Sequence, residues 1–138
     1  MPDILTLRSD AEIAMLREAG RIVARVLEHL KSLVAPGIST LELDREAENL
    51  IRQAGAVPSF LGYGDPPFPG SICASLNEEV VHGIPSANRI LKDGDIISVD
   101  VGACLDGYHG DAARTFIVGH VSPDVGMLVA TAEQCFWD

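Results

Sequence analysis

Two aspartates, Asp100 and Asp111, stand in a stretch that otherwise has the composition of two β-strands, ISVDVGACLDGYHGDAARTF at residues 97–116. Strands are normally depleted in Asp, so a carboxylate in each arm needs a chemical explanation. Between the arms, Asp106-Gly107 is a dipeptide typical of a two-residue hairpin turn. The stretch therefore predicts a β-hairpin with one carboxylate in each strand.

The predicted turn also fixes which residues face each other. With two turn residues, Leu105 lies opposite Tyr108, and Gly102 lies opposite Asp111. Asp100 precedes Gly102 by two residues and so shares a face with Asp111. The two aspartates become diagonal neighbours, about 7–8 Å apart at the backbone. A three-residue loop would place them on opposite faces unless a bulge restored the alternation.

Two bare carboxylates on one face repel each other and are costly to desolvate, and a divalent cation removes both problems. Two metal ions about 3.5–4 Å apart, bridged by carboxylates, suit this geometry. The alternative is that one aspartate caps a turn while the other faces solvent. Asp100 and Asp111 are the candidate metal ligands, and spacing alone leaves both interpretations open.

Histidines supply the other candidate groups. His82 lies in VVHGIP, before a Gly-Pro break, where an imidazole can donate to a substrate carbonyl or amide, or simply hydrogen-bond within its loop. His109 shares the predicted face of Asp111 and is either a ligand or a structural residue. We expect His29 and His120 to lie at the surface.

A segment rich in Gly and Pro, VPSFLGYGDPPFPGS, covers residues 57–71 and predicts a structured loop. Such a set of residues is more often plain core, but aromatic residues on a loop rich in Gly and Pro tend to shape a binding surface. With a nearby cysteine, the candidate pocket residues are Phe60, Tyr63, Phe68 and Cys73. No GxGxxG, P-loop or GxSxG pattern accompanies them, and no His/Asn framework supports a cysteine nucleophile.

The composition of the chain limits its possible size class, partners and cellular location. The chain has 138 residues, 47% of them hydrophobic, which is enough for a single domain, 1–138, with its own core. A net charge of −10 argues against nucleic acid as a partner. The apolar runs are too short for a membrane span, and the N-terminus lacks a signal-peptide pattern. Three cysteines without a CxxC motif are typical of reduced thiols in the cytoplasm.

Capping patterns predict where the helices begin. Ser9 to Glu12 and Ser39 to Glu42 both read S-x-x-E, and each precedes an apolar stripe with helical spacing. The first helix should stop before Pro36-Gly37, and the second should end at Gly55.

We expect strands at residues 72–76, 95–104 and 108–118, with a further possible strand at Val80-Val81. A final helix starts at Ser122-Pro123 and carries an apolar stripe from Val125 to Phe136. Such a stripe needs a surface to pack on. The polypeptide is therefore expected to stop inside a larger fold, the alternative being a helix folded back on its own sheet.

Several ordered motifs resemble one family. LDGYHGDAARTFIVG, KDGDIISVDVG, NEEVVHGIP and PSFLGYGDPPFPGSIC, together with EIAMLREAGRIVARVL and APGISTLELD, resemble the type I methionine aminopeptidases, metallopeptidases of the pita-bread fold. The similarity runs from about residue 9 to residue 138. It implies an α+β fold that is one half of a pita-bread domain, the N-terminal half, with two helices packed on an antiparallel sheet and a C-terminal helix cut short.

The resemblance also implies roles. Asp100 and Asp111 fall on the family's two aspartate metal ligands, and His82 falls on the catalytic histidine that contacts substrate near the scissile bond. Four residues fall on the loop that forms the pocket for the methionine side chain: Phe60, Tyr63, Phe68 and Cys73. In the family, two divalent ions of the cobalt, manganese, iron, zinc or magnesium class activate a water that attacks the bond after an N-terminal Met.

Two departures from the family follow. The family's catalytic domain is about twice as long, and its remaining ligands, a histidine and two glutamates, belong to the absent half. We therefore expect weak metal binding and little or no peptidase activity from this chain alone, unless a second copy or a C-terminal half covers its apolar faces. The pocket loop is also longer by two residues near Asp65-Pro66, which leaves the fine substrate preference open.

Two other functions remain possible at this point. One is a non-catalytic module that binds peptide or protein through the loop, although retention of Asp100 and Asp111 argues against it. The other is a relative of prolidase and creatinase. The compact N-terminus, with no preceding domain, argues against this second possibility.

Overall fold

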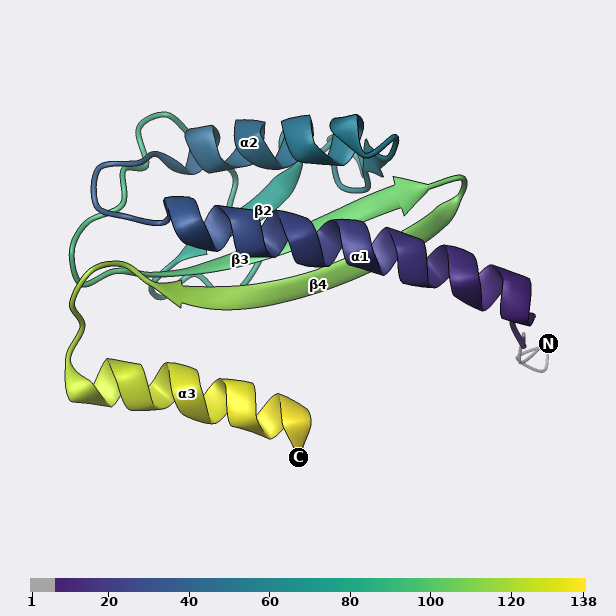
Figure 1. Ribbon diagram of the computed structural model, residues 1–138. Helices are drawn as coiled ribbons and strands as arrows, with labels where there is room; N and C mark the ends of the chain where they lie inside the picture. The colour runs from purple at the N-terminus through teal and green to yellow at the C-terminus, as the bar shows by residue number, and fades with distance from the viewer. Residues whose placement is uncertain (1–6) are drawn as a thin grey trace.

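The computed structural model describes residues 7–138 and shows helices on an antiparallel sheet (Figure 1). The elements, in chain order, are α1 (Asp10–Leu33), α2 (Thr40–Gln53), β1 (Val57–Pro58), β2 (Ile72–Leu76), β3 (Ile96–Leu105), β4 (Tyr108–Ile117) and α3 (Pro123–Trp137). The predicted α+β class is confirmed.

Both N-terminal helices begin at the predicted capping boxes. The Ser9 hydroxyl accepts from the Glu12 N–H, and the Glu12 carboxylate accepts from the Ser9 N–H at 2.8 Å. The same reciprocal pair forms between Ser39 and Glu42. Gly55 follows the end of α2 with φ of 79°, a left-handed conformation that glycine adopts without strain. Local sequence signals therefore set the ends of α2 and the start of α1.

The helices pack on one face of the sheet through their apolar stripes. This core joins two helices and the two long strands, and its fully or nearly buried members include Val23, Val26, Leu27, Leu30, Leu43, Ala47, Ile51, Ile97, Val99, Val101 and Phe116. Buried Asp44 of α2 also accepts hydrogen bonds from the Ser71 and Ile72 N–H groups, at 2.7 and 3.0 Å. The helical layer thus fixes the start of β2.

The sheet is built around β3. Strand β4 pairs with β3 over its whole length, while β2 and β1 share the other edge of β3. The predicted register is confirmed, because Leu105 pairs with Tyr108 and Gly102 pairs with Asp111. Asp106 and Gly107 both have positive φ, 49° and 85°, as a type I′ turn requires.

Two details differ from the sequence-based expectation. The segment read as loop opens with the short strand β1, in which Val57 pairs with Cys104 and Pro58 with Ala103. Proline is tolerated there because β1 lies at a sheet edge. The possible strand at Val80-Val81 is wrong: the chain turns away from the sheet after β2, and both valines are exposed, at 85% and 62%.

Helix α3 stands apart from α1 and α2, beyond β4 (Figure 1). Ser122 caps it by accepting from the Val125 N–H, and Pro123 occupies its first turn, as predicted. None of its residues is buried, so its apolar stripe is not covered by the sheet of this chain. Across residues 7–138, the search for a helix with the length and apolar character of a membrane span finds none.

Candidate metal and substrate site

The candidate site lies on the sheet face opposite the α1 and α2 layer. Along β3, core residues alternate with Ser98 and Asp100, which point to the other face. Cys73 pairs directly with Asp100 across β2 and β3, and Asp111 pairs with Gly102 across β3 and β4. Three adjacent strands therefore bring a thiol and two carboxylates to one patch.

Asp100 is a perturbed carboxyl group within this patch. Burial raises the pKa of its carboxyl, and the negative charge of neighbouring Asp111 raises it further. Its Oδ1 atom is buried and has no hydrogen-bond partner among the described residues. Buried polar atoms are normally paired, so a bound cation or water would satisfy this oxygen.

The chemistry of this carboxylate pair suits a divalent cation. It would neutralise the repulsion between Asp100 and Asp111 and satisfy the orphaned oxygen. Within residues 7–138, however, no set of three or more His, Cys, Asp or Glu side chains comes together as a metal site. The described part of the chain thus offers the Asp100 and Asp111 carboxylates, which are fewer than three ligands of these types.

A cavity of about 1040 Å³ opens over these residues. It brings Cys73, His82, Asp100 and Asp111 together on one wall, and Val129, Ala132, Glu133, Phe136 and Trp137 of α3 contribute to another. Arg114 of β4 reaches Glu133 of α3 at 2.9 Å. The space is large enough for a small peptide and is lined by apolar as well as charged groups.

His82 lies at the exposed rim of this cavity with φ of 60°, a rare conformation for a residue other than glycine. A positive charge on His82 opposes the upward shift in the pKa of Asp100, which places the imidazole within electrostatic reach of the carboxylates. His82, Asp100 and Asp111 thus border the same cavity.

Cys73 is a buried thiol beside Asp100. Burial, followed by the charges of Asp100 and Asp111, raises the pKa of Cys73 to about 11. The thiol is therefore protonated near neutral pH and is a poor nucleophile. Its place in the wall is that of a small apolar side chain.

The aromatic loop residues separate into two groups. Phe60 is half-buried over the patch, where a Cβ on Gly102 would lie 2.8 Å from its Cε1 atom. Tyr63 is 77% exposed. Phe68 is half-buried and donates its N–H to the Tyr63 carbonyl at 2.8 Å, which closes the loop on itself. Phe60, Tyr63 and Phe68 do not line the large cavity, whereas Cys73 does.

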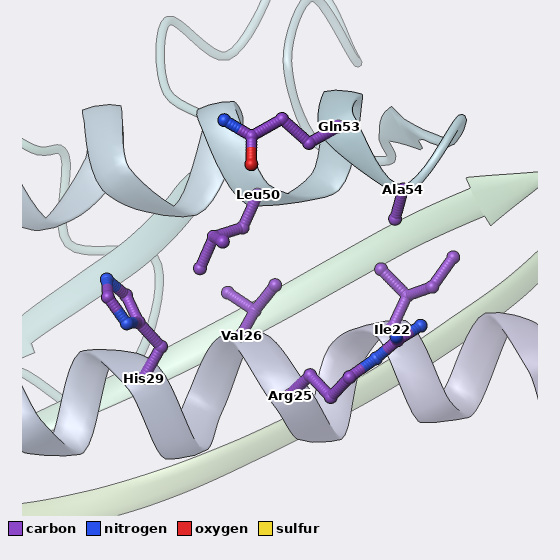
Figure 2. Close-up of a pocket in the computed structure, with 7 residues that line it drawn as sticks. All are labelled: Ile22, Arg25, Val26, His29, Leu50, Gln53 and Ala54. Atoms are coloured by element: carbon purple, nitrogen blue, oxygen red, sulfur yellow. The ribbon is translucent and has the colours of Figure 1, made fainter.

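The remaining histidines lie elsewhere. His109 shares the face of Asp111 but contacts the Ser59 hydroxyl through Nδ1 at 2.8 Å, which anchors the loop to β4. His120 is exposed beside Asp93. His29 lies 3.5 Å from Glu46 and borders a cavity of about 260 Å³ between α1 and α2 (Figure 2). That cavity belongs to the helical layer and not to the carboxylate face.

Sequence reasoning missed the hydroxyl groups of the site. Ser75 and Ser98 line the cavity beside the carboxylates, and Ser98 Oγ lies 2.8 Å from Thr115 Oγ1. The two-residue alternation of the strands could have predicted them, because it places Ser75 on the face of Cys73 and Ser98 on the face of Asp100.

Comparisons with known proteins give a consistent result. Residues 14–137 match the family model of metallopeptidase family M24. The chain is 52% identical over 134 residues to methionine aminopeptidase 1 of Bacillus subtilis, covering 97% of this chain and 53% of that protein. It is 49% identical over 134 residues to the methionine aminopeptidase of Clostridium acetobutylicum, with the same coverage of 97% and 53%.

A solved structure agrees with the sequence matches. The methionine aminopeptidase of Thermotoga maritima has a TM-score of 0.91 and 34% identity, covering 95% of this chain and 52% of that one. The chain thus spans about half the length of the relatives it matches.

Proposed function

Because this chain belongs to metallopeptidase family M24, we propose that it carries the aspartate part of a metal-dependent aminopeptidase centre that removes N-terminal methionine from peptides. Its fold is one half of the pita-bread fold of the methionine aminopeptidases. The observation that carries the proposal is the Asp100 and Asp111 pair, diagonal across β3 and β4, with a buried Asp100 oxygen that has no partner within the described residues.

Asp100 and Asp111 are the residues that would hold two divalent ions, of the cobalt, manganese, iron, zinc or magnesium class. When bound, such ions activate water and polarise the scissile carbonyl. His82 is the proposed catalytic residue that donates a hydrogen bond to the peptide at the cavity rim. The proposed pocket for the methionine side chain consists of Phe60, Tyr63, Phe68 and Cys73, together with His82.

Within this set, the structure supports Phe60 and Cys73 most directly. Phe60 lies against Gly102, the register partner of Asp111, and Cys73 is the register partner of Asp100. Tyr63 and Phe68 would extend the apolar wall only where the loop meets a bound peptide.

Protons compete with metal ions for the Asp100 carboxylate, because a ligand carboxylate must be ionised and the pKa of Asp100 is raised. Metal binding should therefore tighten as the pH rises.

The proposed centre needs further ligands. Two carboxylates with water bind cations weakly, so the chain alone should have little peptidase activity. We propose that the missing ligands come either from the other half of the length of its relatives or from a second copy, and that the same partner covers the apolar stripe of α3. The free thiols Cys73, Cys104 and Cys135 are compatible with action on newly made peptides in the cytoplasm.

Binding of Mn²⁺, followed by electron paramagnetic resonance, tests the metal site. We expect the unaltered chain to bind Mn²⁺ and the Asp100→Asn and Asp111→Asn variants to lose that binding. The matched control is Asp106→Asn, which removes one charge from the same hairpin and keeps a residue suited to its positive φ. Equal binding by all four proteins would refute the site.

Hydrolysis of a Met-Ala-Ser peptide tests the activity. With Mn²⁺ or Co²⁺, we expect no turnover from the chain alone. Turnover that chelator and Asp100→Asn both abolish would show that self-association completes the centre.

A second function, binding of peptide without catalysis, is favoured by the shortage of metal ligands within residues 7–138. Titration of the same peptide in the presence of chelator, followed by the NMR signals of Cys73 and His82, distinguishes it. Saturable binding that needs no metal would favour the binding module.

A further inference from the structure

The segment that carries His82 has little packing of its own. Val80 and Val81, directly before it, are exposed, and the segment forms neither helix nor strand. His82 itself holds a positive φ, which is uncommon for a residue with a side chain. Contacts at the two ends of this segment must therefore set the place of the imidazole.

Gly83 is the first of these fixed points. Its N–H donates to the Ser75 hydroxyl at 3.0 Å, and its carbonyl accepts from the Ala74 N–H at 2.8 Å. A Cβ on Gly83 would lie 2.2 Å from the Ala74 carbonyl oxygen, so the backbone meets β2 at a distance that only glycine permits. The residue after His82 is thus held against the sheet.

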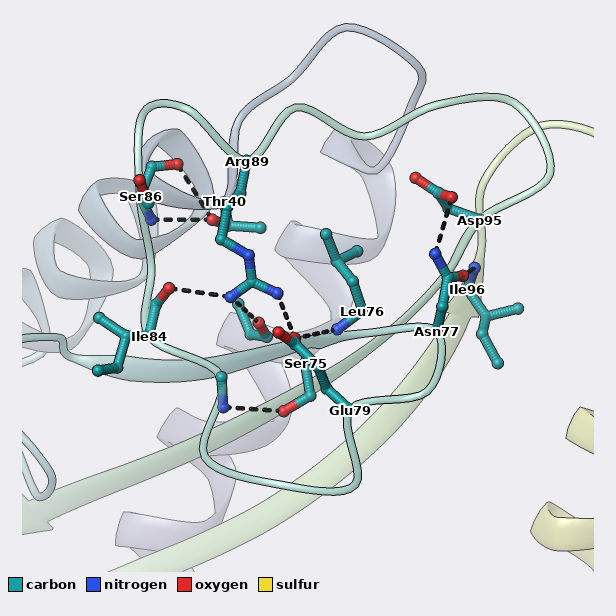
Figure 3. A network of polar contacts seen from close by, with 12 residues as sticks. Thr40, Ser75, Leu76, Asn77, Glu79, Ile84, Ser86, Arg89, Asp95 and Ile96 are labelled. Atoms are coloured by element: carbon teal, nitrogen blue, oxygen red, sulfur yellow. Dashed lines mark hydrogen bonds and ion pairs between the residues drawn. The ribbon is translucent and has the colours of Figure 1, made fainter.

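Arg89 joins both ends of the segment to β2 (Figure 3). Its Nη1 donates to the Ile84 carbonyl at 3.0 Å and to the Ala74 carbonyl at 3.2 Å. Its Nη2 pairs with the Glu79 carboxylate, which also accepts from the Leu76 N–H at 2.8 Å. The Arg89 side chain is only 23% exposed. One guanidinium therefore contacts the chain before His82, the chain after it, and the strand beneath.

From this geometry we propose that Arg89 is a positioning residue that holds His82 at the rim of the cavity beside Asp100 and Asp111. The functional meaning rests on the role proposed above for His82. The planar guanidinium is needed because it donates in several fixed directions at once, whereas a lysine ammonium is a compact charge on a flexible stem. We expect most of the positioning to come from the hydrogen bonds that Arg89 donates to the Ile84 and Ala74 carbonyls. The ion pair with Glu79 contributes less, because it is partly exposed and screened by water.

NMR of the metal-free 138-residue chain tests the proposal. In Arg89→Lys, we expect the Gly83 and Ala74 amides to exchange about tenfold faster, which corresponds to the loss of one charged hydrogen bond. The His82 ring signal should narrow and move toward that of a histidine in an unstructured peptide. Glu79→Gln should change exchange at Gly83 by less than about threefold, because it keeps the carbonyl contacts of Arg89.

The matched control is Arg52→Lys, which alters the Arg52 and Glu48 pair on α2, away from the cavity. It should leave the His82 ring signal and the Gly83 amide unchanged. The double variant Glu79→Arg with Arg89→Glu separates the ion pair of residues 79 and 89 from the hydrogen bonds that Arg89 donates to carbonyl groups. It restores a pair of opposite charges but cannot donate to Ile84 and Ala74 from position 89, so it should not restore the His82 signal.

A folded Arg89→Lys protein with an unchanged His82 signal and unchanged Gly83 exchange would overturn the proposal. So would full rescue by the charge-swapped variant. A purely structural role would instead speed exchange throughout the core, including Val99, without a selective change at His82. These measurements use neither metal nor peptide, so they are independent of the proposed function. Equal Mn²⁺ binding by the unaltered chain and its Asp100→Asn and Asp111→Asn variants would refute that function separately.

Discussion

The two faces of the sheet differ in what they contribute. On the helix-covered face, Ile97, Val99 and Val101 are fully buried and pack against α1 and α2. On the other face, the alternate residues Ser98 and Asp100 border a large cavity. The same strand, β3, supplies both sets.

This difference separates stability from chemistry. Burial of apolar side chains stabilises the folded chain, whereas desolvation of Asp100 beside another carboxylate opposes folding. The helix-covered face offsets that cost, which allows the open face to keep a perturbed, unpaired carboxylate. Four predictions test this division, from the largest expected effect to the smallest.

Leu30→Ala should destabilise the chain by about 2–5 kcal/mol, because it leaves a cavity at a fully buried position of α1. Its control is Leu128→Ala on α3, which is 62% exposed and should change the free energy of unfolding by less than about 0.5 kcal/mol. Urea unfolding measures both. A similar loss for the two variants would contradict the assignment of stability to the helix-covered face.

Gly110→Ala and Gly102→Ala compare overpacking on the two faces. A Cβ on Gly110 would lie 2.6 Å from the backbone of Ala19, so α1 must shift and the loss should be about 1–3 kcal/mol. A Cβ on Gly102 would meet the side chains of Phe60 and Ser59 at 2.8 Å, and a surface loop moves more easily than a helix. Gly102→Ala should therefore cost less while shifting the NMR signals of Phe60. The reverse order in unfolding experiments would refute this comparison.

Asp100→Asn should stabilise the metal-free chain at neutral pH, by less than about 1 kcal/mol because the carboxyl is partly exposed and screened by water. The pKa of Asp100 is raised above 3.8 in the folded chain, so the folded state holds the proton more tightly than the unfolded state. Ionisation therefore opposes folding above the raised pKa, and this penalty disappears as the pH falls toward 3.8.

Unfolding of both proteins in chelator across this pH range measures the effect. The difference between them isolates Asp100 from Asp44, whose pKa burial also raises. A variant that is less stable than the parent at neutral pH would show that the carboxylate supports the fold in the absence of metal.

Thr115→Val should have the smallest effect, a loss of about 0.5 kcal/mol, near the lower limit for one hydrogen bond. It removes the contact between Ser98 Oγ and Thr115 Oγ1 on the open face, and valine retains the preference for a strand. Thermal unfolding provides the measurement. A loss as large as that of Leu30→Ala would mean that the open face also carries the fold.

Local signals made the hairpin and the helix starts predictable. Asp106-Gly107 accepts positive φ at both positions, and once the turn is set, the two-residue period fixes Gly102 opposite Asp111 and the diagonal place of Asp100. The capping boxes at Ser9 and Ser39 likewise need only residues three apart in sequence. Everything required for these features lies within a few residues.

Features that depend on distant partners were not predictable in this way. Strand β1 exists because Val57 and Pro58 reach β3. Val80-Val81 is not a strand because none of the strands within residues 7–138 pairs with it. The sequence did not distinguish Phe60, which lies against Gly102, from exposed Tyr63 on the same loop.

By itself, the sequence determined the carboxylate pair, its register and the helices that cover the sheet, since each follows from short-range geometry. Only the tertiary structure placed Cys73 beside Asp100, left the Asp100 oxygen buried without a partner within the described residues, and tied the His82 segment to β2 through Arg89. Those contacts join residues that are far apart in the chain, and their energies depend on burial, which no local pattern specifies.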